Sequence, residues 1–454
     1  MPLADDTVAL MPAPATAVAI GIAAFPHGTE THGMHERIGD VGAPMGMASG
    51  GSEATFGERQ TGTRPSRIAK SPGSSGPVRH DKHRRVVVIG AGILGATLAW
   101  EMAGRGAHVT LVDRYGPGAG ATGSSLGWLT TQTSFRNGET LSEDARRAYH
   151  LLHRLSLGAW RRLQDSTADS LGVRWTGAVQ MAGAGTEPHD ALERDLDRRL
   201  AWGSPSYRIG ASEIRRLLPG AHVPEGYAGF FAPDEGLVDP AAAVAGLIKA
   251  MTALGASVRW NTEVTSVSGS GGRATDVVTS RGRITCDEVV IATGVDSPTL
   301  SESLGMVVPL ADSRGSLVHV HTLPMFLGPV LMSPEIDVLQ RPDGRVVIAR
   351  PSEDVTDPGV KSDQLLRDAS SLLPALRAGR VEKVTVGRRV VPVDGLPIIA
   401  RSAAFANVRQ VSTNAGMTLA PILAQYLTSE ILDDARIESL APYRSTRFQN
   451  ETRF

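Results

Sequence analysis

The hydrophobic pattern becomes regular after residue 85 and predicts a strand, a helix and a second strand in succession. Residues 86–89 form an unbroken apolar run, which is typical of a strand buried on both faces. A helical pattern follows over 96–105, where Gly104 is suited to end the helix before a strand over 108–113. This order of elements is typical of the unit that cradles a dinucleotide in an α/β fold.

The central part of the chain repeats this alternation of helices and strands. Asp239 and Pro240 are the start signals of one helix, and Gly255 ends it. The elements predicted in this region are helices over 143–163, 191–202 and 240–254, a strand over 257–264, a hairpin over 267–285 and a buried strand over 289–294. The last strand ends in glycine, as expected where a second parallel strand meets the same cofactor.

Short alternating runs over 316–321 and 345–349, separated by proline and glycine, favour an antiparallel sheet. Residues 173–231 have the same character, so we assign both regions to a second domain inserted into the first. The predicted fold is α/β, with an α+β second domain: a Rossmann-like dinucleotide-binding domain carrying an inserted antiparallel-sheet substrate domain. The predicted boundaries are a disordered extension over 1–83, the first domain over 84–170, 236–308 and 384–436, the second over 171–235 and 309–383, and a tail over 437–454.

Three glycines and one acid carry the predicted chemistry of the first unit. Gly90 allows a tight turn, Gly92 lets the backbone approach a pyrophosphate, and Gly95 lets the helix pack close to the strand. The free N–H groups and the positive end of the helix then face the phosphates. Asp113, about 20 residues further on, is placed to accept hydrogen bonds from an adenosine ribose. The alternative is an ordinary strand-to-helix turn.

Two later segments have a composition suited to the same ligand. Residues 116–129 are rich in glycine and hydroxyl groups, which suits a loop folded against pyrophosphate or an isoalloxazine edge, although a flexible linker has similar composition. Gly416 precedes an apolar helical run over 419–431, whose first N–H groups lack intrahelical partners. Such a helix start is able to stabilise negative charge on a reduced flavin, or is only a structural cap.

Together these segments resemble the flavoprotein family of D-amino-acid oxidase, glycine oxidase and sarcosine oxidase. The similarity extends from Arg85 to Leu432. It rests on the unit at 90–113 with its following Gly-Ala-Thr-Gly-Ser-Ser, on Val-Val-Ile-Ala-Thr-Gly at 289–294, and on two distal motifs at 387–397 and 412–421. The resemblance implies that the first domain binds FAD, and that the distal Asp-Gly-Leu-Pro and Thr-Leu-Ala-Pro segments lie beside the flavin.

The resemblance also implies positions for the substrate-binding groups. Arg389, five residues before Asp394, matches the position where an arginine commonly pairs with the substrate carboxylate. A planar guanidinium suits this role because it makes two parallel hydrogen bonds. On a strand, only one of Arg388 and Arg389 faces the flavin, and a surface salt bridge is the alternative for Arg389. Ser412 and Asn414 stand where an imidazole is often found, and we predict Asn414 as a second catalytic residue.

Departures from the family pattern bear on cofactor attachment and substrate. Members that attach flavin covalently use cysteine or histidine where this chain has Arg388 or residues 123–127, so the FAD is predicted to be noncovalent. Val390 replaces a common proline, which leaves the substrate open. Trp128 and Arg136 are weaker candidates for the flavin face. The predicted cofactor-contacting residues are Gly90, Gly92, Ile93, Leu94, Gly95, Asp113, Arg114, Thr122, Ser124, Ser125, Val264, Thr293, Gly294, Asp394, Gly395, Gly416, Met417 and Thr418.

The reaction implied by the resemblance is oxidation of an amine or amino acid by hydride transfer to flavin N5, after which water hydrolyses the imine. In such reactions the protein orients the C–H bond, keeps the amine neutral and shields the site from water. Oxygen or a separate electron acceptor would reoxidise the flavin. Two alternatives stay open: oxidation of a 2-hydroxy acid or other non-amine, whose carboxylate would bind an arginine equally well, and noncatalytic flavin binding.

Length and composition limit the number of domains, the kinds of partner and the cellular compartment that we expect. The 454 residues predict about two or three domains, and a formal net charge of −1 gives no reason to expect nucleic acid or an anionic membrane as a partner. The apolar stretch over 11–25 contains prolines and is too short to span a bilayer, so no integral membrane association is expected. Cys286 is the only cysteine, which excludes an internal disulfide and fits a reducing, cytoplasmic setting.

No metal site is expected from the sequence. Cysteine and histidine residues at zinc-ligand spacing are absent. His319 and His321 share one face of a predicted strand, but no third ligand accompanies them, so ordinary strand histidines are the favoured interpretation.

Overall fold

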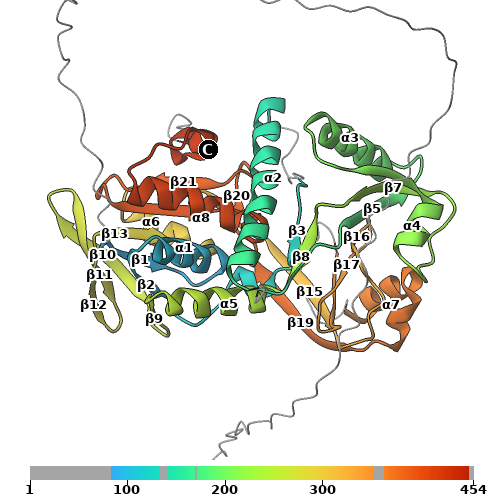
Figure 1. The fold of residues 1–454 in the computed structure, drawn as a ribbon, viewed down its shortest axis with the longest axis horizontal. Helices are drawn as coiled ribbons and strands as arrows, with labels where there is room; N and C mark the ends of the chain where they lie inside the picture. The colour runs from blue at the N-terminus through green and yellow to red at the C-terminus, as the bar shows by residue number, and fades with distance from the viewer. Residues whose placement is uncertain (1–82, 133–140, 169–170, 351–361, 449–454) are drawn as a thin grey trace, which may run out of the picture. The chain divides into compact units, whose positions relative to one another are not determined.

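The fold is that of a computed structural model, which describes residues 83–132, 141–168, 171–350 and 362–448. The described residues belong to one compact unit by their contacts. The division into a cofactor domain and a substrate domain therefore stays a prediction. The arrangement of elements nevertheless separates into two large sheets with different topologies (Figure 1).

The first large sheet has six strands in the order β21-β22-β13-β1-β2-β9. All neighbouring pairs are parallel except β21 with β22. Because β2 and β13 lie on opposite sides of β1, the connections leave β1 in opposite directions, which opens a crevice at its carboxyl end. The strands are β1 (Arg85–Ile89), β2 (His108–Val112), β9 (Ser257–Arg259), β13 (Glu288–Ile291), β21 (Ile398–Arg401) and β22 (Val408–Ser412).

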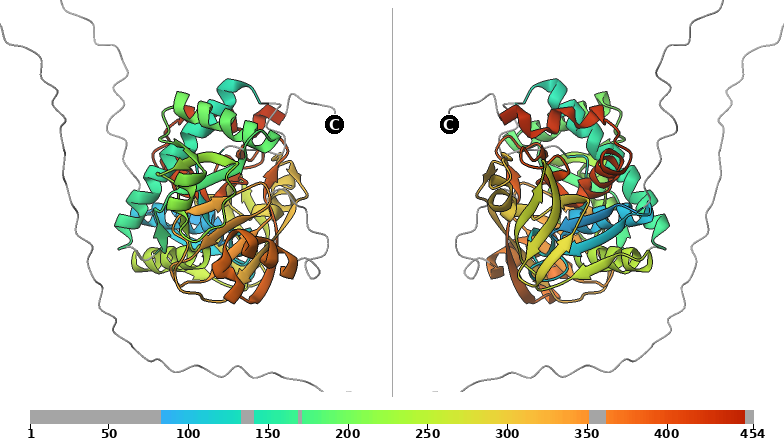
Figure 2. Two further views of the ribbon diagram at one scale, coloured as in Figure 1. Left: turned by 90° about the vertical axis from the view of Figure 1, so that its right-hand side faces the viewer. Right: turned by 90° about the vertical axis from the view of Figure 1, so that its left-hand side faces the viewer.

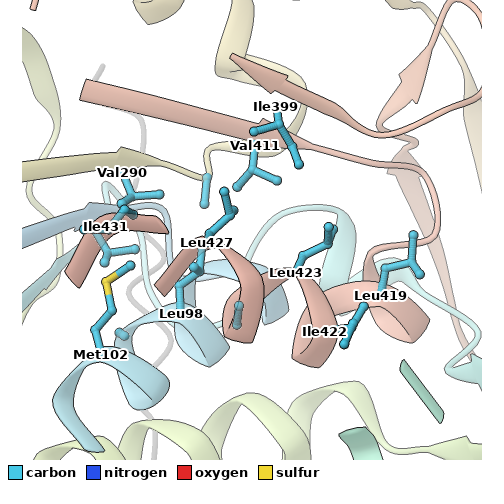
Figure 3. Packing of buried hydrophobic residues seen from close by; sticks show 14 of the residues in the cluster. Leu98, Met102, Val290, Ile399, Val411, Leu419, Ile422, Leu423, Leu427 and Ile431 are labelled. Carbon is cyan, nitrogen blue, oxygen red and sulfur yellow. The ribbon is translucent and has the colours of Figure 1, made fainter. Parts of the chain in front are cut away.

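Helices cover one face of this sheet. Helix α8 is apolar around most of its circumference, because it packs against α1 and α2 as well as against the strands. Figure 3 shows Leu427 of α8 between Leu98 of α1 and the strand side chains Val290 and Val411. The helices of this layer are α1 (Ile93–Gly104), α2 (Glu143–Ser166), α5 (Pro240–Ala253) and α8 (Gly416–Leu432).

The second large sheet has eight strands in the order β19-β15-β18-β17-β16-β5-β7-β6. It contains strands from both of the regions that the alternating pattern assigned to the second domain. All pairs are antiparallel except β16 with β5, which is parallel. The strands are β5 (Ala178–Gly183), β6 (Tyr207–Gly210), β7 (Tyr227–Ala232), β15 (Arg314–Val320), β16 (Val330–Met332), β17 (Asp337–Gln340), β18 (Val346–Ala349) and β19 (Val381–Arg388).

Helices α4 (Ala211–Leu217) and α7 (Ser362–Leu372) pack on one face of the second sheet. Ile214 of α4 and Leu365 of α7 join the buried cluster on that face, where Figures 1 and 2 show the two helices. Leu317 and Val347 belong to a separate cluster on the other face. Side chains alternate along a strand, so Phe230 and Ala232 of β7 lie on this second face with Ala178, and α3 (Glu187–Ala201) packs against them there.

Smaller elements complete the described chain. Three short sheets are formed by β10 (Val264–Ser270), β11 (Arg273–Thr279) and β12 (Gly282–Thr285), by β14 (Leu310–Ala311) and β20 (Val391–Pro392), and by β3 (Trp128–Leu129), β8 (Gly236–Val238) and β4 (Val173–Arg174). The remaining helices are α3 (Glu187–Ala201) and α6 (Ser297–Glu302), with 3-10 turns at Ala121–Ser124, Gly294–Asp296, Pro374–Ala378, Glu438–Tyr443 and Ser445–Phe448. Within the described ranges, no helix is both long and apolar enough to cross a membrane.

Several predicted elements need correction at their ends, including α1, which begins at Ile93 and not at 96, and β13, which ends at Ile291 and not at 294. The strand predicted over 257–264 is two strands, because the chain turns at Asn261, whose φ is 50°, between β9 and β10. Helix α3 begins four residues before the predicted 191, since the Thr186 hydroxyl caps it by accepting the His189 N–H. Helix α8 begins at Gly416 itself and not at 419.

Truncating a side chain in the first core should destabilise the fold. Leu427 is fully buried, so Leu427→Ala should lower the free energy of unfolding by about 2–5 kcal/mol through lost burial and a residual cavity. Leu155→Ala, at a half-exposed position on α2, is the matched control and should stay within about 0.5 kcal/mol. Urea denaturation of both variants measures the difference, and equal losses would contradict the packing described here.

Candidate active site

Two adjoining cavities lie between the two large sheets. The first has a volume of about 850 Å³ and extends from the carboxyl end of β1 to the strands β15 and β19. The second has a volume of about 670 Å³ and is bounded by α2, β5, β16 and the start of α8. The residues that line both cavities, and so mark their junction, are Ser125, Leu126, Asp337, Arg389, Asn414 and Met417.

The glycine turn after β1 leaves no room for side chains. Gly90 has φ 103°, and a Cβ there would lie 2.5 Å from the carbonyl oxygen of Ala292. A Cβ on Gly95 would lie 1.8 Å from the carbonyl oxygen of Gly90, so α1 rests directly on the turn. Gly92 lines the first cavity, whereas Gly95 does not and serves the packing alone. This close approach brings the start of α1, at Ile93 and Leu94, to the cavity wall.

Asp113 holds the glycine turn as well as facing the first cavity. Its Oδ2 accepts the Ala91 N–H at 2.8 Å, and its Oδ1 accepts the Tyr115 N–H at 2.8 Å. Each carboxylate oxygen has a second lone pair, so the group keeps capacity for a ligand hydroxyl. Arg114 also lines this cavity and pairs with Asp296 at 2.6 Å.

The loop after β2 folds onto the start of α1. Thr122 Oγ1 accepts the Ile93 N–H at 3.0 Å, which fixes the loop against the helix. A Cβ on Gly387 would lie 2.4 Å from the Cβ of Ser124, so β19 of the second sheet passes directly over this loop. Other predicted contact residues on the first-cavity wall are Ser125, Val264, Thr293, Gly294, Gly395, Gly416 and Met417.

Two further predicted contact residues lie away from the first cavity. Asp394 lines neither cavity and forms a two-bonded ion pair with Arg447, with distances of 2.6 and 3.1 Å. Thr418 lines only the second cavity, where its Oγ1 accepts the Thr130 N–H at 3.3 Å. Trp128 also lines the second cavity, and its Nε1 donates to Glu235 at 3.0 Å, while Arg136 lies outside the described residues.

Arg389 lies at the junction of the two cavities. It follows β19, and its N–H donates to the Ser313 carbonyl at 2.8 Å. Its guanidinium lies across the backbone of Gly315, since a Cβ there would come within 2.4–2.7 Å of the guanidinium atoms. Arg388 lines only the first cavity, with its side chain 53% exposed and 3.8 Å from Asp296. Of the two arginines, only Arg389 therefore reaches the second cavity.

Asp337 is a buried carboxyl that the sequence analysis did not identify. It begins β17, lines both cavities and is 9% exposed. Burial raises the pKa of Asp337 to about 8, while the positive charge of Arg389 acts in the opposite direction. One signal in the sequence could have revealed it: an acid within the otherwise apolar run Ile336-Asp337-Val338-Leu339.

His153 and Gln180 add buried polar groups to the second cavity, and the sequence analysis missed both. His153 Nδ1 lies 2.8 Å from the Thr130 carbonyl, which can only accept, so Nδ1 carries the proton and Nε2 presents a lone pair. Burial lowers the pKa of His153 to about 4, so the ring is neutral near pH 7. Neither His153 Nε2 nor Gln180 Nε2 has a hydrogen-bond partner among the described residues.

The histidines and the cysteine outside the cavities have ordinary surroundings. His319 Nε2 lies 2.9 Å from Thr385 Oγ1 of the neighbouring strand. His321 Nδ1 accepts the Arg380 N–H at 3.1 Å. Cys286 is buried in the apolar cluster beside the first sheet, and burial raises its thiol pKa to about 12. In the described ranges, no group of three or more potential metal ligands comes together.

Comparison with known proteins identifies a family and individual proteins that this chain is similar to. Residues 85–430 match the family described as FAD dependent oxidoreductase. A glycine oxidase of Bacillus licheniformis is 24% identical over 374 residues, which cover 81% of this chain and 98% of that protein.

Solved structures show the same fold. The glycine oxidase of Geobacillus kaustophilus is 22% identical with a TM-score of 0.70, covering 80% of this chain and 99% of that one. The L-amino acid deaminase of Proteus vulgaris, with its specific insertion sequence deleted, is 23% identical with a TM-score of 0.71, covering 83% and 97%.

A substitution in the glycine turn tests the first cavity as a dinucleotide site. Gly90→Ala should weaken FAD retention at least about tenfold, since the positive φ alone costs about 1–3 kcal/mol and the new methyl group meets the Ala292 carbonyl. Gly104→Ala, at the far end of α1, is the control, because its Cβ would make only an ordinary contact at 3.9 Å. Flavin absorbance per protein after gel filtration measures retention, and a Gly90→Ala protein with full flavin would refute the assignment.

Proposed function

This chain belongs to the FAD-dependent oxidoreductase family, and from that premise we propose that it oxidises the C–N bond of a small amino acid in the second cavity. Membership in this family confirms the resemblance identified in the sequence. The observation that carries the proposal is the placement of Arg389 at the junction of the two cavities. A cation that faces both cavities is able to bind a substrate carboxylate while the rest of the substrate stays beside the cofactor site.

The residues of the first cavity fit FAD. The glycine turn and the start of α1 suit the pyrophosphate, and Asp113 suits the ribose. The start of α8 at Gly416, on the same cavity wall, suits the flavin ring. No cysteine or histidine is among the described residues that line this cavity, which supports noncovalent binding. Bound FAD supplies the acceptor for the hydride that leaves the substrate C–H bond.

The side chains at the junction bind and orient the substrate in this proposal. Arg389 makes two parallel hydrogen bonds to the carboxylate, and the backbone of Gly315 beneath the guanidinium limits its movement. Asn414 lines both cavities, so its amide is placed to bind a polar group of the same substrate. Met332 and Met417, on the wall of the second cavity, reduce contact between the reacting carbon and water.

We also propose the setting in which the enzyme works. Oxygen or a separate electron acceptor completes the catalytic cycle, and the rate of reoxidation in air-saturated buffer distinguishes the two. A lone, buried Cys286 is compatible with the reducing conditions of the cytoplasm, where we place the protein.

An anaerobic substrate panel tests the proposed reaction. At least one α-amino acid or N-methylated amino acid should bleach the flavin absorbance of the holoenzyme, because the amine nitrogen supports hydride loss from the adjacent carbon. The corresponding 2-hydroxy acids should leave the spectrum oxidised. If only 2-hydroxy acids bleached the flavin, the enzyme would oxidise an alcohol and not an amine. If no compound changed the spectrum, the protein would be a noncatalytic flavoprotein.

Removing the Arg389 guanidinium should weaken substrate binding. Arg389→Met should raise KM for the best amino acid about 100-fold, because two charge-assisted hydrogen bonds are lost at about 1.5–3 kcal/mol each and part of that loss is recovered by water. Arg380→Met is the matched control, since Arg380 immediately precedes β19 as Arg389 immediately follows it, and its side chain is exposed. Both variants should retain full FAD. An unchanged KM in Arg389→Met would remove Arg389 from the substrate site.

A further inference from the structure

Asp337 shares one face of the second sheet with the residues around Arg389. Asp337 pairs with Ala349 across β17 and β18, and Ala349 pairs with Leu317 across β18 and β15. Residues that pair directly lie on the same face, and Gly315, two residues before Leu317, shares that face as well. Because the Arg389 guanidinium lies on Gly315, the carboxyl and the guanidinium belong to one surface that faces the cavities.

The Asp337 carboxyl is aimed into the cavities without a hydrogen-bond partner among the described residues. It is more than nine-tenths buried, lines both cavities, and accepts none of the side-chain hydrogen bonds in the described ranges. A buried carboxyl without a hydrogen bond is costly to the folded state, so such a group calls for a ligand that supplies a donor. An ammonium group is the donor that an amino acid brings.

We propose that Asp337 is a catalytic residue that binds the substrate ammonium and accepts one of its protons, while Arg389 binds the carboxylate. The proposal rests on the proposed function and names the substrate class as zwitterionic α-amino acids. In the transfer, an N–H bond of R–NH3+ breaks and an O–H bond forms on the Asp337 carboxylate, leaving R–NH2 and a neutral carboxylic acid. No electrons are gained or lost in this step. The nitrogen lone pair that it frees is required for hydride loss from the adjacent carbon.

Proton affinity favours Asp337 over the other groups in the second cavity. Burial gives Asp337 a pKa of about 8, which lets it hold a proton taken from an amine, whereas the pKa of His153 is about 4. His153 Nε2 is therefore an acceptor for an N–H hydrogen bond but a poor holder of the proton. Burial also raises the pKa of Tyr149, which lines the second cavity. The other charged or titratable residues that line the first cavity are Asp113, Arg114, Tyr115, Glu263, Asp296, Arg350, Arg388 and Arg389.

The pH dependence of flavin reduction tests the proton transfer. With the best amino acid from the panel, Asp337→Asn should slow anaerobic reduction at pH 7 about 100-fold, the size expected for loss of a positioned base. At pH 10 the loss should fall below about fivefold, because the solution then supplies the neutral amine. Asp337→Glu should retain most activity at both pH values. The control Asp312→Asn, at an exposed position, should match the parent protein.

A structural role for Asp337 would give a different result. If the carboxyl only maintained the cavity, Asp337→Asn would lower the reduction rate by the same factor at pH 7 and pH 10. That outcome, or full activity of Asp337→Asn at pH 7, would overturn the proposal while leaving the proposed function intact. A panel in which no amino acid reduces the flavin would instead overturn the proposed function.

Thermal unfolding of the holoenzyme supplies a second test that needs no substrate. A buried carboxyl with a raised pKa binds its proton more tightly in the folded state, so it stabilises the fold fully only below the pKa of the unfolded chain. That contribution is lost as the pH rises from about 4 through 8. Asp337→Asn cannot titrate, so its Tm should exceed that of the parent protein by a margin that grows across this range. A margin that stays constant with pH would show that Asp337 is not a proton-holding buried acid.

Discussion

The contact between Gly95 and the carbonyl oxygen of Gly90 determines the geometry on which the whole site depends. With an ideal Cβ position only 1.8 Å from that oxygen, any side chain at residue 95 would push α1 away from β1. The absence of side chains lets the start of the helix rest on the turn. Asp113 holds the turn in place by accepting a hydrogen bond from the Ala91 N–H. The positive end of α1 therefore opens at the carboxyl end of β1, where the connections of the parallel sheet diverge.

The second sheet contributes side chains that the first sheet could not supply. Its cavity-facing surface carries Asp337 and the bare backbone of Gly315, on which Arg389 lies. β19 also passes so close to the loop after β2 that Gly387 admits no Cβ beside Ser124. The second sheet thus contacts the loop after β2 beside the first cavity, and Arg389 and Asp337 from the second sheet reach the junction of the two cavities. In the proposed function, the first sheet and its loops hold the cofactor, and the second sheet supplies the groups that bind the substrate.

Sequence analysis predicted the parts of the site that depend on local order and missed those that depend on strand register. The glycines and Asp113 lie within one strand–helix–strand unit, so their spacing alone places them at one sheet edge. Asp337 and Gln180 come from strands that carry no motif, and only the pairing of β17 with β18 and of β5 with β16 brings their segments to the same cavity. Asp394 shows that a motif can also mislead, because a residue within it can have a distant partner. Its neighbour Gly395 lines the first cavity, but the Asp394 carboxylate binds Arg447 from the C-terminal segment.

Burial and the charge of Arg389 act on the pKa of Asp337 in opposite directions. A neighbouring cation lowers the pKa of a carboxyl, yet burial outweighs the charge of Arg389 here, and the pKa of Asp337 stays above its ordinary value. Near pH 7 Asp337 therefore holds a proton more firmly than an exposed carboxyl does, and in the proposed reaction only its ionised form can take a proton from a substrate ammonium group. In the proposed complex, a substrate carboxylate bound at Arg389 would offset the influence of the guanidinium on Asp337, whereas the substrate ammonium group would lower the pKa of Asp337. The two ends of a zwitterion thus act on the pKa of Asp337 in opposite directions, and the ammonium group, which meets the carboxyl directly in this proposal, favours the ionised form that accepts the proton.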